Sequence, residues 1–295
     1  MVLLPSGSSS RVIASKLDQA GVIRNRYAFL LLHYLKPTRS LKAGEYQFTR
    51  DANSIEVLDR IARGDILRHT VVVPEGYTMF EIAQAVESAG LGKAAEFLNI
   101  AEHDTTLIRN IDPQAQTLEG YLFPDTYQFT RTQSMHDIVA AMVHQFQREA
   151  TAIGLSQDVH RVVTLASIVE KETAISDERP LVASVYENRL RQNIALGADP
   201  TVAYAAMISG HYRGTIYQSD LQFDSPYNTY RYVGLPPGPI ANPGVASIKA
   251  AMQPAVSDYL YFVAEGNGSG RHRFSSSYEQ HQRNVAAYRR AVAQR

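Results

Sequence analysis

Cysteine is absent from this sequence of 295 residues. Without a thiol, the chain has no disulfide bridge, no cysteine metal ligand and no cysteine nucleophile. The same absence fits a protein of the cell envelope, although it does not establish that compartment.

An excess of charge of either sign is also missing. Lys and Arg number 29 and Asp and Glu number 29, which leaves a formal net charge of +0. Nucleic-acid-binding domains need a strong basic excess, so the composition argues against a nucleic-acid partner. A hydrophobic content of 45% with 20% charged residues is typical of a soluble globular protein, and the length allows two domains or one large one.

No long apolar run occurs. The most apolar stretch, Tyr27 to Leu35, has about half of the roughly 18 residues that a membrane span needs. The first ten residues lack the basic region and apolar core of a signal peptide. We therefore expect this chain to be soluble.

Several catalytic signatures are missing as well. The sequence has no phosphate loop, no dinucleotide fingerprint and no HExxH zinc motif, and Ser167 lacks the Gly-x-Ser-x-Gly elbow of serine hydrolases. His272 and His281 have no partner at ligand spacing, which favours hydrogen-bonding roles over metal binding. We expect neither a metal nor a cofactor.

An internal repeat is present in the first third. Residues 4–22 and 73–91 each predict a strand, a Pro/Gly turn, a Ser or Thr cap, an amphipathic helix and a glycine stop, with Pro5 and Pro74 in equivalent places. A short strand at 43–48 and a capped helix at 54–61 lie between the copies. Two copies are too few for a solenoid and favour a small α+β region, a kind of module that usually binds or positions a ligand.

The pattern breaks at 110–113, which we take as a domain junction. Helices are predicted over 135–153, 157–173, 183–192 and 247–252, with another beginning at Asp199 and a last one carrying His281. Residues 259–264 and 271–275 flank a glycine-rich turn and predict a β-hairpin. We expect an α+β fold, with an N-terminal α+β region at 1–115 and a mixed α+β catalytic domain at 116–295.

The stretch LASIVEKET (165–173) places glutamates at the end of an apolar helix. Glu172 follows Ile168 by four residues and Leu165 by seven, so it shares their buried face, whereas Glu170 is expected further round, in water. Desolvation at the edge of an apolar face raises a carboxyl pKa and can keep its proton ready for donation. The same residues also fit an exposed helix end with ordinary charges.

Two irregular segments, 225–230 and 234–244, are rich in Tyr, Asn, Thr and Pro. Such a stiff polar loop suits a carbohydrate cleft, and it equally suits a surface loop fixed for stability. For Asp199, before Pro200, a plain helix cap is the favoured interpretation. Acids beside aromatic and amide-rich loops point weakly to glycosidic-bond chemistry. These acids are Glu119, Asp125, Glu170, Glu172 and Asp199.

Seven segments, in order, resemble the signatures of the YceG-like family of endolytic murein transglycosylases, and the resemblance covers nearly the whole chain. They are LEGYLFPDTY (118–127), LASIVEKET (165–173), ASVYENRL (183–190), DPTVAY (199–204), SPYNTY (225–230), GLPPGPIANPG (234–244) and YLYFVAEG (259–266). The N-terminal units are similar to the LysM-like region of that family.

The resemblance implies a lytic transglycosylase that cleaves the β-1,4 bond between N-acetylmuramic acid and N-acetylglucosamine without adding water. One acid protonates the leaving oxygen and then, as carboxylate, takes a proton from the muramyl 6-hydroxyl, so that a 1,6-anhydro ring closes. By motif this acid is Glu172, and no second carboxylate is expected to pair with it. The residues implied to bind or line the substrate site are Glu119, Asp125, Glu170, Asp199, Tyr227, Asn228, Thr229 and Tyr230.

The resemblance also implies peptidoglycan glycan strands as substrate and peptidoglycan synthases as partners, at the outer face of the cytoplasmic membrane. Two features depart from the family pattern. Its members usually carry a membrane-spanning helix before the first repeat, so we expect such an anchor in the full-length protein. They also usually have Leu-Gln-Ser or Leu-Gln-Thr before DPTV, where this chain has Leu196-Gly197-Ala198, which puts any sugar contact of that amide and hydroxyl in doubt.

Two other functions remain open at this point. A glycan-binding scaffold that recruits synthases and cuts little is favoured by the repeats and by the change at Gly197 and Ala198. A hydrolase could use the same acid with an activated water. Turnover of purified strands separates the enzyme from the scaffold, and product mass separates the transglycosylase from the hydrolase.

Overall fold

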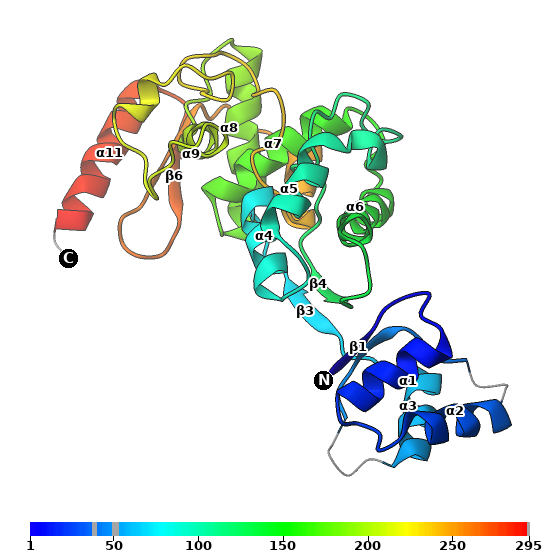
Figure 1. Cartoon of the computed structure of the whole chain (residues 1–295). Coiled ribbons are helices and arrows are strands. Elements are labelled where there is room, and N and C mark those ends of the chain that lie inside the picture. The colour runs from blue at the N-terminus through cyan, green and yellow to red at the C-terminus, as the bar shows by residue number, and fades with distance from the viewer. Residues whose placement is uncertain (37–39, 49–52, 294–295) are drawn as a thin grey trace. The chain divides into compact units, whose positions relative to one another are not determined.

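The structure, a computed structural model, describes residues 1–36, 40–48 and 53–293. Helices form most of its regular secondary structure, and the strands pair into two-stranded antiparallel sheets (Figure 1). The predicted α+β class is confirmed.

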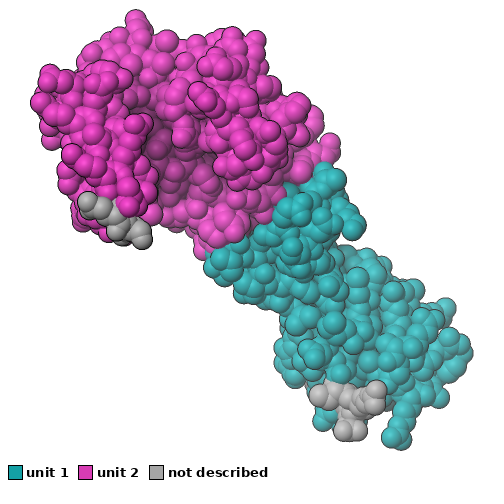
Figure 2. Space-filling model, turned by 90° about the vertical axis from the view of Figure 1, so that its left-hand side faces the viewer, with its two compact units in different colours: residues 1–72, 83–97, 126–138 teal, residues 73–82, 98–125, 139–295 magenta. Residues whose placement is uncertain are grey.

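The chain folds into two compact units, which Figure 2 distinguishes. Unit 1 comprises residues 1–72, 83–97 and 126–138, and unit 2 comprises 73–82, 98–125 and 139–295. Because the chain passes between them several times, neither unit is one continuous segment. The functional division at residues 115 and 116 is a different kind of boundary and stays a prediction.

The first third contains the predicted repeat of strand, turn and helix. Its elements are β1 (Val2–Leu4), α1 (Ser10–Gln19), α2 (Arg26–Leu35), β2 (Gly44–Tyr46), α3 (Ser54–Arg63), β3 (His69–Val72), α4 (Met79–Ser88) and α5 (Ala94–His103). Strand β1 pairs with β2, and β3 pairs with β4 (Thr126–Phe129), both antiparallel. The core of unit 1 gathers large side chains from β1 to α3, among them Leu17, Phe29, Tyr46 and Leu58.

The helix caps explain why both repeats fold locally as they do. Ser9 Oγ accepts a hydrogen bond from the Val12 amide at the start of α1. At the start of α4, Thr78 Oγ1 accepts from the Glu81 amide while the Glu81 carboxylate accepts from the Thr78 amide, which forms a capping box. The predicted Ser and Thr caps are therefore confirmed.

Unit 2 is built around helix α7 (Val159–Glu172), which packs against α8 (Arg179–Arg191), α9 (Asp199–Ile208) and α10 (Val245–Met252). Every residue from 162 to 169 is buried, so α7 is a central helix and not the one-sided amphipathic helix that the apolar spacing predicts. The remaining elements are η1 (Thr105–Leu107), α6 (Met135–Ala152), η2 (Ser176–Glu178), η3 (Asp220–Gln222), β5 (Tyr261–Ala264), β6 (His272–Ser275) and α11 (Tyr278–Ala293).

The predicted β-hairpin and the long irregular segment are both present in unit 2. Strands β5 and β6 pair antiparallel, with Tyr261 opposite Ser275, and α11 packs against both. Residues 223–244 form neither helix nor strand. These irregular and hairpin segments lie near α7 and α8 in the fold and supply the walls of the site described next.

Candidate active site

Glu172 is the last residue of α7, where the buried helix reaches the surface of a cavity. Its Oε1 accepts a hydrogen bond of 2.7 Å from the hydroxyl of Tyr186, a buried residue of α8. Among the described residues no other hydrogen bond to this carboxyl occurs. One carboxyl oxygen is thus held by the protein, and the other is available to a substrate.

The cavity beside Glu172 has a volume of about 420 Å³. The space-filling view shows that the surface of unit 2 is hollowed (Figure 2). The lining residues come from α7, α8, the loop between α8 and α9, α9, the irregular segment, β5 and α11. They are Glu172, Tyr186, Arg189, Leu196, Gly197, Asp199, Tyr230, Tyr261, Phe262, Tyr278 and His281. Acids, aromatic rings and one arginine therefore converge on one polar pocket.

Burial raises the pKa of Glu172 to about 6. The hydrogen bond from Tyr186 works in the opposite direction because it stabilises the carboxylate, and the negative charge of Asp199 adds to the rise. A carboxyl group with a pKa near the working pH can both donate and retrieve a proton. The predicted desolvation of Glu172 is confirmed.

Asp199 is the second acid of the cavity. Helix α9 begins at Asp199 itself, and the capping position belongs to Ala198, so the favoured interpretation of Asp199 as a plain cap is wrong. Its Oδ1 instead accepts a hydrogen bond of 2.6 Å from the hydroxyl of Tyr230. Asp199 lines the same cavity as Glu172, and its negative charge acts on Glu172; that no second carboxylate pairs with Glu172 in the reaction stays a prediction.

Arg189 of α8 fastens three parts of the wall together. Its Nη1 donates to the Leu196 carbonyl at 2.6 Å, and its Nε donates to the Leu260 carbonyl at 2.7 Å. Its guanidinium lies over the ring of Tyr261, 5.2 Å from the ring centre. That ring stacks on His281 of α11, with 5.0 Å between the centres. These contacts connect α8, β5 and α11 on the aromatic side of the cavity.

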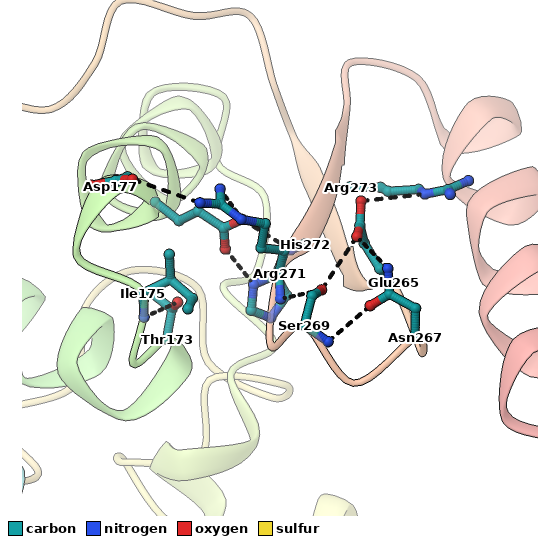
Figure 3. A network of polar contacts seen from close by, with 10 residues as sticks. Thr173, Ile175, Asp177, Glu265, Asn267, Ser269, Arg271, His272 and Arg273 are labelled. Carbon is teal, nitrogen blue, oxygen red and sulfur yellow. Dashed lines mark hydrogen bonds and ion pairs between the residues drawn. The ribbon is translucent and has the colours of Figure 1, made fainter. Parts of the chain in front are cut away.

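The β5–β6 turn is tied to the segment that follows Glu172, as the close view shows (Figure 3). The Glu178 carboxylate accepts from the backbone amide of His272 at 3.1 Å and lies 2.8 Å from its Nδ1. Arg271 forms an ion pair with Asp177 at 3.7 Å. These contacts fix the turn against η2 and give His272 the expected hydrogen-bonding role.

Glu170 differs from Glu172 in its surroundings. Its side chain is only 5% exposed, so the expectation that it lies in water is wrong. One oxygen forms an ion pair of 2.8 Å with Arg179, and the other accepts from the Gly244 amide at 3.0 Å. Glu170 thereby connects α7 to the start of α8 and to the end of residues 234–244, which we call the proline-rich loop.

Glu119 is a buried carboxyl in the scaffold, 1% exposed. Both of its oxygens accept from the Met79 amide at the start of α4, and Oε1 accepts from Asn242 Nδ2 at 2.7 Å. Burial raises the pKa of Glu119 to about 8. Since Asn242 also accepts from the Leu122 amide and donates to the Tyr77 carbonyl, these two residues join the proline-rich loop to residues 77–79 and 119–122.

Of the SPYNTY segment (225–230), only Tyr230 lines the cavity. The other residues named here pack or bond within the protein. Asn228 is fully buried and donates to the carbonyls of Leu221 and Phe223. The hydroxyl of Thr229, also buried, accepts from the Ala198 amide. Tyr227 packs on Tyr204, with 5.1 Å between the ring centres.

Of the nine residues predicted from the sequence for the site, the structure brings three into the cavity: Glu172, Asp199 and Tyr230. The cavity lining does not include Glu119, Glu170, Tyr227, Asn228 or Thr229. Asp125 is exposed and does not line this cavity; its backbone carbonyl accepts from the Val73 amide.

Sequence reasoning missed four functional candidates in the cavity: Tyr186, Arg189, Tyr261 and Tyr278. Tyr186 and Arg189 belong to ASVYENRL and Tyr261 to YLYFVAEG, so the family resemblance marked their segments without assigning them roles. The helical register of α8 offered a further signal, because Tyr186 and Arg189 are three apart and share one face. No comparable signal exists for Tyr278.

Within residues 1–36, 40–48 and 53–293, no group of three or more His, Asp or Glu is arranged to hold a metal ion. In the same part of the chain, no helix is both long and apolar enough to span a bilayer.

Comparison with known proteins finds relatives that match most of the chain. The profile of the YceG-like family matches residues 2–287. The endolytic murein transglycosylase of Bacillus subtilis strain 168 is 36% identical over 289 residues, which cover 90% of this chain and 78% of that protein. The endolytic murein transglycosylase of Streptococcus pneumoniae D39 is 30% identical over 97% of this chain, which spans only 57% of that longer relative.

A solved structure of a YceG-like protein also matches this chain. The 2.6 Å crystal structure of a YceG-like protein from Listeria monocytogenes matches with a TM-score of 0.63 and 34% identity, over 96% of this chain and 97% of that one. Because the family profile extends over nearly all of the sequence, the chain belongs to the YceG-like family.

Proposed function

We propose that this chain is an endolytic lytic transglycosylase of peptidoglycan. It cleaves the β-1,4 bond between N-acetylmuramic acid and N-acetylglucosamine within glycan strands, leaves 1,6-anhydro ends and thereby ends the elongation of nascent strands. The observation that carries this function is Glu172: a partly desolvated carboxyl group with a pKa of about 6, in a polar cavity lined by tyrosines. The names of the relatives agree with it.

The chemistry needs one group that works twice. Protonated Glu172 gives its proton to the glycosidic oxygen as the bond from that oxygen to the muramyl C1 breaks. The resulting carboxylate then takes the proton of the 6-hydroxyl while that oxygen bonds to C1 and closes the anhydro ring. Protons and bonds balance without water, and Glu172 ends the cycle protonated.

Asp199 and Tyr186 adjust this group. The positive charge that develops near C1 in the transition state is stabilised by the carboxylate of Asp199, which Tyr230 holds in place. The negative charge of Asp199 also favours the protonated form of Glu172 before cleavage, whereas Tyr186 stabilises the carboxylate formed after cleavage. The two neighbours thereby hold the pKa of Glu172 at a value that allows it to donate a proton in the first step and accept one in the second.

In this proposal the other predicted site residues have a structural role and do not contact the substrate. Glu119, Glu170, Asn228 and Thr229 direct their polar atoms at the protein itself, so they shape the cleft from behind. Tyr227 is packed among aromatic rings in the same role.

The N-terminal and envelope features complete the proposal. Residues 1–115, similar to a LysM-like region, bind or position glycan, and residues 116–295 carry the chemistry. The full-length protein acts at the outer face of the cytoplasmic membrane, held there by a membrane anchor, and works beside peptidoglycan synthases.

Mass spectrometry of muropeptides after digestion of purified sacculi tests the function. A transglycosylase releases anhydro-muramic ends, whereas products heavier by one water, with reducing ends, would identify a hydrolase. That alternative has a structural reason, because Asp199 supplies a second carboxylate that could activate water. Absence of any cleavage would instead favour the glycan-binding scaffold.

A further inference from the structure

Helix α2 of unit 1 exposes most of its large apolar side chains. Tyr34 is 80% exposed, Tyr27 and Leu35 are each 66% exposed, and Leu31 is 60% exposed. The helix is anchored in the core of unit 1 mainly by the buried Phe29. Single exposed apolar residues are ordinary, but four on a helix of ten residues form a patch of the kind that marks a contact surface.

This patch, which we call the α2 face (Tyr27, Leu31, Tyr34 and Leu35), borders an open groove. The groove has a volume of about 1040 Å³ and lies between the start of α1 and α2. Its lining residues are Ser10, Arg11, Leu30, Leu31, His33, Tyr34 and Leu35. The α2 face therefore offers a partner an apolar contact beside a cationic side chain, Arg11.

The N-terminal part of the sequence, which carries the α2 face, has an excess of positive charge. Residues 1–48 contain seven Lys or Arg and two Asp or Glu, an excess of five positive charges that the rest of the chain balances with five negative ones. Arg11, Arg24 and Arg26 are exposed on or beside α1 and α2. Arg26 also lies over the ring of Tyr27, 4.9 Å from its centre. A net charge of zero for the whole chain conceals this asymmetry.

We propose that the α2 face binds the surface of a bilayer that contains anionic phospholipids. Leucines can enter the boundary of the acyl chains, tyrosines are favoured at the headgroup level, and the arginines meet lipid phosphates. A glycan strand fits less well. Sugar sites surround their stacked rings with hydrogen-bonding side chains, whereas half of the α2 face is leucine.

Vesicle co-sedimentation of the full chain tests the proposal. We expect binding to vesicles of phosphatidylglycerol and phosphatidylcholine, little binding to phosphatidylcholine alone, and weaker binding as salt rises. Replacing Arg11 and Arg24 by Gln should weaken binding by about fivefold for each cation removed. Equal binding to both vesicles, or none to either, contradicts the proposal.

A matched pair of variants separates the α2 face from a general effect of charge. Leu31→Glu/Tyr34→Glu should weaken binding to the anionic vesicles by at least about tenfold. Ile208→Glu/Val256→Glu adds the same charge at exposed positions of unit 2 and should bind like the parent chain. Circular dichroism verifies that both fold.

Three further results would overturn the proposal. The first is equal loss of binding in both double variants. The second is unchanged vesicle binding in the α2 variant together with lost binding to peptide-free glycan strands, which would assign the face to glycan. The third is a dimer of the parent chain that the α2 variant alone dissociates, in the absence of vesicles, which would assign the face to a second copy.

Discussion

Unit 2 contains two groups of carboxyl side chains that the protein treats in opposite ways. In the scaffold, Glu119 and Glu170 have protein partners on both oxygens. In the cavity, Glu172 receives one hydrogen bond, from Tyr186, and Asp199 is exposed and receives one from Tyr230. Under the proposed function, with Glu172 as the acid, this difference means that burial alone does not identify a reactive acid: a catalytic carboxyl group must also keep an oxygen that the fold leaves for the substrate.

The largest effect is expected at Glu172. Glu172→Gln keeps the shape and the contact with Tyr186 but cannot donate and retrieve a proton, so turnover of purified sacculi should fall by about 10³-fold. Circular dichroism and glycan binding should match those of the parent chain. Retention of full turnover would mean that the two groups of acids have been assigned the wrong roles.

Glu170→Gln should have the opposite effect to Glu172→Gln: it should lower stability and leave cleavage intact. It removes one partner of an ion pair whose side chains are 5% and 8% exposed, and it should cost about 3 kcal/mol of unfolding free energy. Glu75 lies 3.5 Å from the same Arg179 nitrogen and limits the loss. Denaturant unfolding measures the change, and cleavage should persist well below the melting temperature. A fully stable but inactive Glu170→Gln would contradict the comparison.

Glu119 should make stability depend on pH. Its pKa is raised from 4.5 to about 8 on folding, so folding takes up a proton between these values. The contribution is present below about pH 4.5 and is lost as pH rises towards 8, with a slope of up to about 1.4 kcal/mol per pH unit. Glu119→Gln has no proton to take up and should flatten this slope in unfolding series from pH 5 to 9. An unchanged slope would place the proton uptake elsewhere.

Asp199→Asn tests the second acid of the cavity. Loss of its negative charge should lower turnover by about ten- to a hundredfold through weaker stabilisation of the transition state. The remaining products should still carry anhydro ends, because Glu172 performs both proton transfers in the proposed mechanism. Complete loss of activity in Asp199→Asn, with reducing ends from the parent chain, would instead indicate that Asp199 activates water.

The smallest effect is a shift of the pH profile. The kcat/KM value should fall as pH rises through about 6, because the general acid must be protonated in the free enzyme. Tyr186→Phe removes a bond to the carboxylate and should move this fall to higher pH, whereas Asp199→Asn should move it to lower pH. Shifts in the same direction for both variants would show that Glu172 does not set the profile.

The sequence was informative where a short pattern determines a local outcome. Helix caps such as Ser9 and Thr78 were predictable because capping involves residues three apart. The face of Glu172 followed from its spacing to Ile168 and Leu165. The solvation of Glu170 was not predictable, because it depends on Arg179 and on Gly244, which lies 74 residues away. Long-range contacts of this kind are not visible in the periodicity of the sequence.

The same limit applies to the cavity. Asp199 was predicted as a cap from its place before Pro200, yet its partner Tyr230 is 31 residues further along. The family resemblance named both residues as site candidates without indicating that they touch. Local sequence therefore identified the acids, and only the fold showed which of them meet.

The walls of the cavity make its assembly depend on the last helix of the chain. They extend from Glu172 to His281, and α11, which carries Tyr278 and His281, packs on the hairpin that supplies Tyr261. Contacts between segments this far apart in the sequence are expected to form late, because a long loop must close before they are gained. Under the proposed function, a chain whose last helix is undocked lacks one side of the cleft beside Glu172. The complete cleft is therefore expected only after α11 has docked.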